Sequence, residues 1–326
     1  MSVVNVAVWG LGPHAIKNIL PSLKACPEIR LYGVCSRDAE TVSRFASQYE
    51  CTGWIDPAAM LQDRMVDVVY LSTPIGLHAA QGKSVLLAMK HLWCEKPLTT
   101  NLTQAHELVN LSRTHGVSLA EGFMYLYHPQ FARLREIIES RRLGSLHQVT
   151  LRFGIPPLDK PGFRNDASLG GGAFLDVGSY LISAATALLA GAEPEVLFSE
   201  IDVPSGSPVD TGGRAILRYP GSGNPVNVIL EWGINRAYRN EVDLWGSAGS
   251  VSTERIFSKP ADYIPKFRFL DRHGKESCEY GRAENHFLAM FKAFLGLARD
   301  SQAAENERID IVRRAALIDK IQRTKI

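Results

Sequence analysis

The sequence has little of what marks exported, membrane-spanning or nucleic-acid-binding proteins. Its five cysteines are odd in number and show no CxxC spacing, so we expect reduced thiols and a cytoplasmic protein. No apolar run approaches the ~18 residues that would span a membrane, and the first residues form no basic leader. The net charge of +2 gives no field that would attract nucleic acid or a membrane surface. The nine histidines have no ligand spacing with carboxylates or cysteines, so we expect no bound metal.

What is present is the composition of a globular protein. Of the 326 residues, 45% are hydrophobic and 21% are charged, which is enough material for two domains. Strand and helix patterns alternate from residue 3 to about residue 121, which predicts a doubly wound parallel sheet. Later segments alternate as strands, which predicts a large, open and mainly antiparallel sheet over 147–154, 194–203, 211–219, 225–234 and 238–246.

These patterns define the predicted domains and the fold class. We expect an α/β protein with an N-terminal Rossmann domain over 1–122 and a C-terminal α+β domain over 123–304. A last helix over 305–324 is expected to pack back on the first domain.

A glycine fingerprint follows the first predicted strand. Residues 3–9 are rich in valine, and Gly10-x-Gly12-x-x-Ala15 comes directly after them. The first glycine allows a sharp turn, the second allows a pyrophosphate to approach the backbone, and the alanine lets the next helix pack closely. The helix would direct its free N–H groups at the phosphates. We therefore place six residues in a dinucleotide site: Gly10, Leu11, Gly12, Pro13, His14 and Ala15.

The end of the second strand, 29–35, bears on which dinucleotide binds. An acid at this position binds the 2′-hydroxyl of NAD, whereas an arginine suits the 2′-phosphate of NADP. Ser36 and Arg37 stand here, and Asp38 is one or two residues late and suited to cap the following helix. We therefore expect NADP rather than NAD. The alternative is that Arg37 is a solvated turn residue.

Two further turns lie at the carboxyl ends of predicted strands, where ligands of such sheets bind. Leu71, Ser72, Thr73 and Pro74 end the fourth strand, and His78 opens the next helix, either as a cofactor contact or as a structural residue.

The fifth strand, 91–94, delivers Glu95, Lys96 and Pro97. A lysine in a desolvated site can supply a proton, although a surface ion pair is the simpler alternative.

The second half of the chain contains another group of candidate catalytic and binding residues. Arg164 precedes a run of three glycines, and Asp176 and Tyr180 follow it four residues apart, on one face of a predicted helix. Together with a lysine they would form a proton-handling set. A helix cap and a buried aromatic ring are the alternative reading.

Taken together, these blocks resemble the Gfo/Idh/MocA family, that of glucose–fructose oxidoreductase and inositol dehydrogenase. In that family the lysine of the Glu-Lys-Pro block is catalytic, and the peptide bond to the proline is often cis. Members with a tyrosine at the position of Tyr180 include the nucleotide-sugar 3-ketoreductases of deoxysugar pathways. The segment 153–157 with Arg164 most resembles that group.

The resemblance implies further roles. Arg164 would touch the cofactor, Asp176 the sugar, and Lys17 the substrate or its phosphates; we place Tyr125 in the substrate site as well. The family commonly has an arginine where Leu126 stands, so a contact of that arginine is not expected here. Family members often pair through the exposed face of the second sheet, which implies a homodimer or homotetramer.

The resulting expectation is an NADP(H)-dependent oxidoreductase acting on a sugar-like carbonyl or secondary alcohol, with a carbohydrate or nucleotide sugar as substrate. Lys96 would protonate the developing alkoxide, with Tyr180 as its partner and Asp176 beside them. Two alternatives stay open: an NAD-dependent glycosidase of the same fold, and a non-catalytic NADP-sensing regulator.

Overall fold

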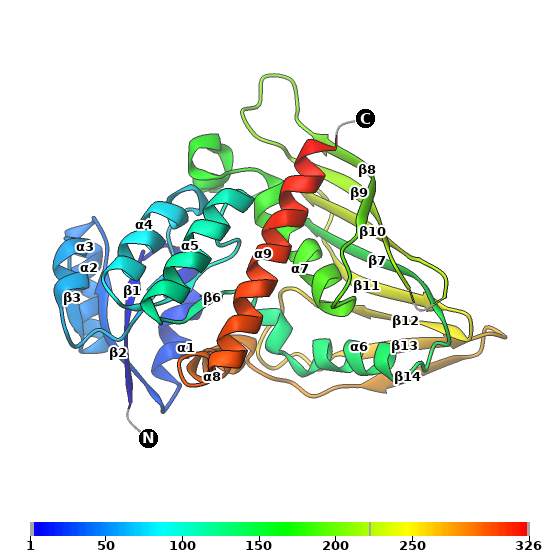
Figure 1. The fold of residues 1–326 in the computed structure, drawn as a ribbon, viewed down its shortest axis with the longest axis horizontal. Coiled ribbons are helices and arrows are strands. Elements are labelled where there is room, and N and C mark those ends of the chain that lie inside the picture. Colours follow the sequence, from blue (N-terminus) through cyan, green and yellow to red (C-terminus); the bar gives the residue numbers. More distant parts are fainter. Residues whose placement is uncertain (1–2, 222, 325–326) are drawn as a thin grey trace. The chain divides into compact units, whose positions relative to one another are not determined.

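The computed structural model describes residues 3–221 and 223–324, which form two compact units (Figure 1). The first unit consists of Met1–Gly122 and Phe287–Val312. The second consists of Phe123–His286 and Arg313–Ile326. Each unit has its own sheet, and each is described by itself.

The first unit is built on a six-stranded parallel sheet in the order β3-β2-β1-β4-β5-β6. The order reverses direction at β1 and β4, as in a doubly wound fold. This confirms the predicted N-terminal sheet. Its strands are β1 (Val4–Trp9), β2 (Ile29–Cys35), β3 (Thr52–Trp54), β4 (Val68–Leu71), β5 (His91–Cys94) and β6 (Leu119–Glu121).

The helices of this unit begin and end at recognisable signals. Asp38 and Asn101 accept backbone N–H bonds at the starts of two helices, and Gly116 ends one in the left-handed conformation. The stretch after the glycine fingerprint begins as a π-helix. The helical elements are η1 (Ala15–Ile19), α1 (Leu20–Lys24), α2 (Ala39–Tyr49), α3 (Pro57–Gln62), α4 (Ile75–Leu87), α5 (Leu102–His115) and α8 (His286–Leu297).

Aromatic side chains of α8 complete the core of the first unit. Phe291 lies 5.5 Å from the ring of Tyr70 and 6.0 Å from that of Trp93, centroid to centroid. Phe294 lies 5.5 Å from Trp93. Tyr70 and Trp93 are fully buried on neighbouring strands. The loops that follow β4 and β5 therefore start from a rigid, well-packed core.

The second unit holds an eight-stranded sheet in the order β14-β13-β12-β11-β7-β10-β9-β8. Neighbours are antiparallel except β7 and β10, which are parallel. A large, mainly antiparallel sheet was expected and is confirmed. Its strands are β7 (Leu146–Ile155), β8 (Glu195–Asp202), β9 (Gly212–Tyr219), β10 (Val226–Ile234), β11 (Arg239–Gly246), β12 (Gly249–Glu254), β13 (Lys266–Asp271) and β14 (Glu276–Tyr280).

The helices of the second unit precede and follow β7 in the chain. They are η2 (Met124–Tyr127), α6 (Pro129–Glu139), η3 (Gly162–Asn165), η4 (Ala167–Leu169), η5 (Phe174–Gly178) and α7 (Ser179–Leu188). The run Ala167–Leu188 has the length and apolar composition of a membrane span, but 83% of its most apolar window is buried inside the structure, as in a core helix. The last helix, α9 (Ser301–Arg323), contributes residues to both units.

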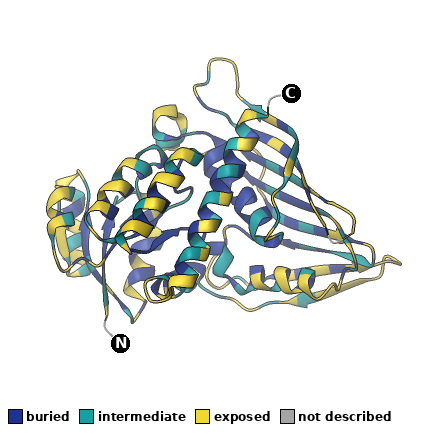
Figure 2. Cartoon of the chain, viewed as in Figure 1, coloured by how far each residue is buried: buried dark blue, intermediate teal, exposed yellow. Residues whose placement is uncertain are grey.

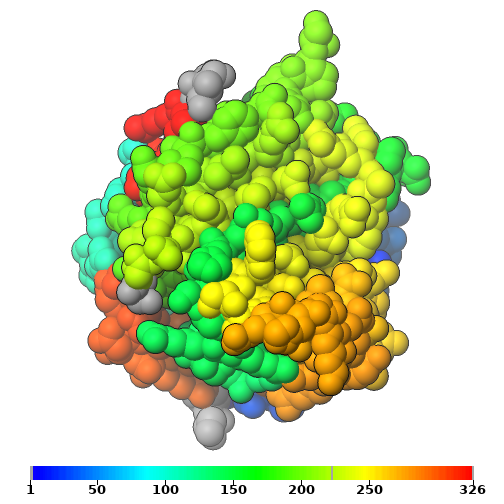
Figure 3. Space-filling view, turned by 90° about the vertical axis from the view of Figure 1, so that its right-hand side faces the viewer, coloured from blue at the N-terminus to red at the C-terminus, as the bar shows by residue number. Residues whose placement is uncertain are grey.

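Burial follows the alternation of the strands. In β11 the side chains of Val242 and Leu244 are buried, whereas Trp245 is 57% exposed. Figure 2 shows the same contrast across the sheet, with buried positions running along the strands. Figure 3 looks onto the side of this unit where strand segments, coloured from green to orange, reach the surface. One face of the sheet is therefore core and the other carries exposed side chains.

Candidate functional site

The glycine turn of the first unit combines a closed and an open position. Gly10 has a φ of +106°, and a Cβ there would lie 2.4 Å from the carbonyl oxygen of Ser72. Around Gly12, by contrast, nothing lies within 4 Å of the place a Cβ would take. Ala15 is fully buried, so the helix packs closely on the strand as predicted. The turn thus fits a group that must approach the backbone, such as a pyrophosphate.

The end of β2 presents a cation beside this turn. Asp38 accepts the N–H of Glu40 at 3.2 Å and the hydroxyl of Thr41 at 2.5 Å, so its carboxylate caps α2 as expected. Ser36 is half-buried and Arg37 is exposed. Within residues 3–221 and 223–324, Arg37 makes no hydrogen bond or ion pair. The acid is engaged locally and the guanidinium is available to a ligand.

Glu95 joins the glycine turn to the ends of β4 and β5. Its Oε1 accepts the hydroxyl of Tyr70 at 2.6 Å and lies 2.9 Å from Nε2 of His14. Asn18 donates to the other ring nitrogen of His14 at 3.1 Å, so the neutral ring would carry its proton on Nε2 and donate it to the carboxylate. Burial raises the pKa of Glu95, but His14, Tyr70 and Lys96 outweigh it and bring the pKa down to about 2. A fixed negative charge therefore stands next to Lys96.

The backbone around Lys96 is fastened from two sides. The peptide bond between Lys96 and Pro97 is cis, the state that the resemblance implied. The N–H of Leu98 donates to the buried carboxylate of Glu121 at 2.7 Å, and the carbonyl oxygen of Pro97 lies 2.9 Å from Nδ1 of His78. Glu121 was not predicted from the sequence as a site residue, although it is an acid at the end of a buried strand, much like Glu95.

Two predicted cofactor residues do not face outward. Leu71 and His78 have no exposed surface, so a direct contact with a cofactor does not suit either of them. The Nε2 of His78 lies 2.8 Å from the carbonyl oxygen of Thr73. Burial lowers the pKa of His78, and the two carbonyl contacts and the nearby carboxylates oppose that effect. His78 is the fourth residue of α4, and both of its ring nitrogens face backbone carbonyl oxygens.

The remaining predicted residues of this unit lie on or near its surface. Leu11 and Ser72 are half-buried, as are Thr73 and Pro74, while Pro13, His14 and Lys17 are exposed. Thr73 donates its hydroxyl to Gln81 at 2.6 Å, which fixes the turn after β4.

In the second unit the structure brings Arg164 and Asp176 together. Nε of Arg164 donates to Oδ2 of Asp176 at 2.5 Å, and the carboxylate is largely buried. Asp176 lies in the π-helix η5, directly before α7, which carries Tyr180. Short π-helical turns occur often at functional sites because the extra residue re-aims side chains.

Tyr180 lies in an aromatic cluster. Its ring is 7% exposed and has edge contacts with Phe153 at 5.3 Å and Phe123 at 5.6 Å between centroids. Its hydroxyl is 3.8 Å from Sδ of Met124. The cluster fixes the ring, so the hydroxyl has one direction.

Tyr125 was expected to bind substrate, and its burial does not suit that role. It is fully buried, and its hydroxyl lies 2.5 Å from Oγ of Ser183 and 3.2 Å from the carbonyl oxygen of Tyr180. A side chain with no exposed surface supports the helix that carries Tyr180 instead of reaching a ligand.

Asp210 is a site residue for which the sequence held no signal. Its Oδ2 accepts the N–H of Phe174 at 2.8 Å, and its carbonyl accepts that of Ala173 at 3.1 Å. A Cβ at Gly172 would lie 2.2 Å from Oδ1 of Asp210. Asp210 therefore holds the start of the helical run that includes Asp176. Burial raises the pKa of Asp210 to about 6, although bonds such as that from Phe174 lower it in part.

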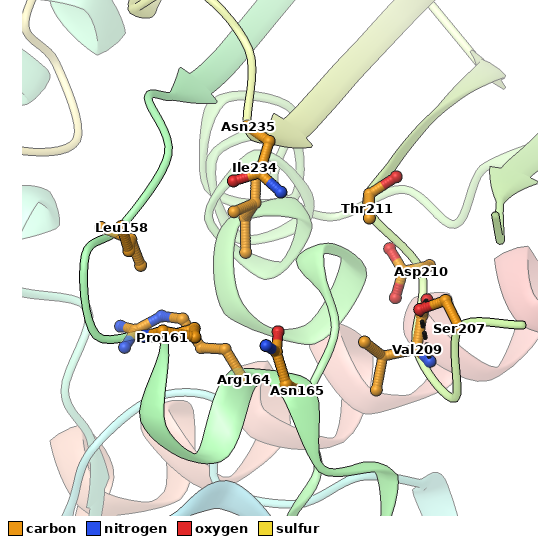
Figure 4. Close-up of a pocket in the computed structure, with 10 residues that line it drawn as sticks. All are labelled: Leu158, Pro161, Arg164, Asn165, Ser207, Val209, Asp210, Thr211, Ile234 and Asn235. Carbon is orange, nitrogen blue, oxygen red and sulfur yellow. Dashed lines mark hydrogen bonds between the residues drawn. The ribbon is translucent and has the colours of Figure 1, made fainter.

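Asp210 also lines a cavity of about 230 Å³ in the second unit (Figure 4). The carboxylate of Asp210 and the amide of Asn165 point toward its middle, and Ile234 approaches from the opposite side. Arg164 belongs to the lining, which connects the cavity to the Arg164–Asp176 pair. The lining is otherwise mixed, with Leu158, Pro161, Ser207, Val209, Thr211 and Asn235.

Comparison with known proteins gives matches along the chain. Residues 4–123 match the oxidoreductase family with an NAD-binding Rossmann fold, and residues 131–252 match the Gfo/Idh/MocA C-terminal domain. The chain is 31% identical to a dTDP-3,4-didehydro-2,6-dideoxy-alpha-D-glucose 3-reductase of Streptomyces violaceoruber, over 98% of this chain and 94% of that protein. It is 32% identical to the enzyme of the same description from Saccharopolyspora spinosa, over 98% and 96%.

The solved structures agree with these matches. A 3-ketoreductase from Actinomadura kijaniata, in complex with NADP and TDP-benzene, superposes with a TM-score of 0.91 at 31% identity. The superposition covers 98% of this chain and 97% of that one. Likeness of this extent, together with both domain matches, settles the family. The chain belongs to the Gfo/Idh/MocA family of oxidoreductases.

Proposed function

We propose that this protein is an NADP(H)-dependent nucleotide-sugar 3-ketoreductase, which reduces a keto group of the sugar to a secondary alcohol. The observation that carries the proposal is the placement of Lys96. It leaves β5 in the same unit as the glycine turn, beside the ionised carboxylate of Glu95. Relatives similar over nearly the whole chain are reductases of dTDP-linked keto sugars, which supports this substrate class.

The residues of the first unit fit the cofactor. Gly12 leaves open space for a pyrophosphate, and Arg37 offers an exposed guanidinium for a 2′-phosphate while Asp38 is held by the helix it caps. The Actinomadura relative was solved with NADP, which supports the same choice here. When bound, NADPH supplies the hydride that reduces the carbonyl carbon.

Lys96 is the proposed proton donor. As negative charge develops on the carbonyl oxygen, the ammonium group stabilises it and then transfers a proton to the alkoxide. Glu95 stays ionised across the physiological range because its pKa is about 2, so a negative charge stands beside Lys96.

Tyr180 and Asp176 are the proposed residues of the second unit. Tyr180 would orient the substrate and share the proton, and Asp176, held by Arg164, would bind a sugar hydroxyl. In the Actinomadura enzyme, structures exist of variants at one lysine and one tyrosine, which are as many residues apart as Lys96 and Tyr180. This agreement supports the pairing of these two roles.

Oxidation of NADPH, followed at the nicotinamide absorbance, tests the proposal. The substrates are a dTDP-linked 3-keto sugar, free keto sugars and an aromatic dicarbonyl. We expect turnover on the dTDP-linked sugar, and a loss of about 10²–10⁴-fold in rate in Lys96→Ala. Lys83→Ala, which changes a surface lysine paired with Glu107 in the same unit, is the matched control.

The other outcomes of this assay point elsewhere. Cleavage of a glycoside without net oxidation of the cofactor would identify a glycosidase of the same fold. Tight binding of NADPH with no turnover in either direction would identify a regulator. Undiminished turnover in Lys96→Ala would remove the lysine from the mechanism.

We further propose that the exposed face of the second sheet joins copies of the chain into a homodimer or homotetramer. Trp245, Leu270 and Tyr280 are exposed on β11, β13 and β14, with 39–68% of each side chain accessible. Apolar side chains gathered on a sheet face favour burial against a partner. A cytoplasmic location stays a prediction.

A further inference from the structure

Two backbone turns meet at one buried imidazole. His78 has no exposed surface, and its two ring nitrogens face carbonyl oxygens of different turns. Nδ1 lies 2.9 Å from the oxygen of Pro97, and Nε2 lies 2.8 Å from that of Thr73. The segment Ser72–Thr73 packs closely against Gly10, where there is no space for a Cβ. The ring therefore connects the end of β4 with the residue that follows Lys96.

We propose that His78 is a positioning residue for Lys96: through the carbonyl of Pro97 it fixes the direction in which the lysine leaves the sheet. The inference rests on the role of Lys96 proposed above. His78 is not a ligand of cofactor or substrate, because a side chain with no exposed surface cannot reach either.

Two hydrogen bonds hold the backbone that follows Lys96, one at Pro97 and one at Leu98. On one side His78 binds the carbonyl of Pro97, and on the other Glu121 accepts the N–H of Leu98. The ionised carboxylate of Glu95 attracts the ammonium of Lys96, and Glu121 acts on the backbone of the loop. Without the imidazole, only the Glu121 bond would define where the lysine points.

The expected effect follows from the geometry of proton transfer. A donor displaced by about 1 Å can cost 10²-fold in rate, although binding of the substrate is unchanged. The loss should therefore appear in kcat. KM for the sugar should change little, since the residues proposed to bind it belong to the second unit and His78 hydrogen-bonds within the first.

Two substitutions of His78 distinguish its contact with Pro97 from its contact with Thr73. Because burial lowers the pKa of His78, the ring is neutral and only one of its nitrogens carries a proton; we assign that proton to Nδ1, which donates to Pro97. Asparagine places an amide N–H where His78 has Nδ1, so His78→Asn keeps a donor to Pro97. Glutamine places an amide where the ring has Nε2, so His78→Gln leaves the carbonyl of Pro97 without this donor. We expect kcat of His78→Gln to fall about 10–100-fold, and that of His78→Asn to stay within about three-fold of the native value.

The matched control is His91→Asn. His91 begins β5, the strand that ends beside Lys96, and its Nδ1 lies 2.8 Å from Oγ of Ser118 at the other edge of the sheet. This change should lower thermal stability and leave kcat as it is. All variants are compared as full-length chains, with unfolding curves recorded to show that each is folded.

The outcomes decide between positioning and plain packing. A selective loss of kcat in His78→Gln with rescue in His78→Asn supports the proposal. Equal kcat in the two variants, or a larger loss in His78→Asn, overturns it. Native protein without turnover on a dTDP-linked 3-keto sugar would count against the proposed function.

A readout without substrate tests the positioning itself. Acetylation of Lys96 by acetic anhydride, measured against pH by mass spectrometry, reports the proton affinity of the amine beside Glu95. The profile should shift in His78→Gln and match the native one in His78→Asn. The same profile in all three proteins would overturn the inference.

Discussion

Replacing Asp210 by asparagine should stabilise the protein at neutral and alkaline pH. Burial raises the pKa of this carboxyl from 3.8 to about 6, so the folded chain holds the proton more tightly than the unfolded chain does. The stability contributed by the protonated acid is present at low pH and is lost as the pH rises through 6. At about 1.4 kcal/mol per pH unit, the charge costs up to about 3 kcal/mol at pH 8.

The variant keeps the hydrogen bond while removing the charge. The amide oxygen of asparagine can still accept the N–H of Phe174, which Asp210 now binds at 2.8 Å. At pH 8 the free energy of unfolding should therefore rise by as much as about 3 kcal/mol, or about 4 °C in melting temperature for a chain of 326 residues. At pH 4 the gain should shrink to about 0.5 kcal/mol, because the unfolded carboxyl is then about half protonated.

The measurement is chemical or thermal unfolding at several pH values between 4 and 8. Asp166→Asn is the control, because Asp166 is an exposed carboxylate whose pKa is lowered by hydrogen bonds from Ser168. That variant should lose stability at pH 8, the opposite sign. A gain for Asp210→Asn that is the same at pH 4 and pH 8, or a loss at pH 8, would refute the reasoning.

Three other substitutions test separate parts of the structure. Arg37→Ala should raise KM for NADPH about 10–100-fold, since a hydrogen bond to a charged group contributes roughly 1.5–3 kcal/mol, and it should leave KM for NADH unchanged; equal effects on both would exclude a contact with the 2′-phosphate. Tyr125→Phe should cost about 1 kcal/mol of unfolding free energy with no change in KM, and a large rise in KM would contradict its burial. Trp245→Glu should lower the sedimentation coefficient by splitting the oligomer, and an unchanged value would place the interface elsewhere.

The sequence predicted both sheets because their apolar periods are strong. The strands of the first sheet and strands β7 to β11 of the second were placed within about two residues. Strands β12, β13 and β14 were not predicted. In β14, Glu276, Ser277 and Cys278 are all exposed, so this strand has no alternation to detect. Helix α8 was not singled out because it is apolar around most of its surface, which periodicity does not separate from a buried strand.

In the candidate site the sequence located residues but not the directions of their side chains. A motif places Tyr125 and His78 near the ends of strands, yet packing turns both inward, and only the folded chain shows this. The contact of Asp210 with Phe174 spans 36 residues and depends on how β9 meets the helix, so no local pattern predicts it. The pair Arg164 and Asp176 lies within one loop and helix, and there the prediction and the geometry agree.

The two glycines of the fingerprint are required for different reasons. Gly10 is needed by the fold itself, because any side chain there would collide with the carbonyl of Ser72 whether or not a nucleotide is bound. Gly12 meets nothing within 4 Å, so the empty chain would tolerate alanine and only a bound pyrophosphate would not. A related protein that no longer binds a nucleotide would therefore still need Gly10, but could accept a substitution at Gly12.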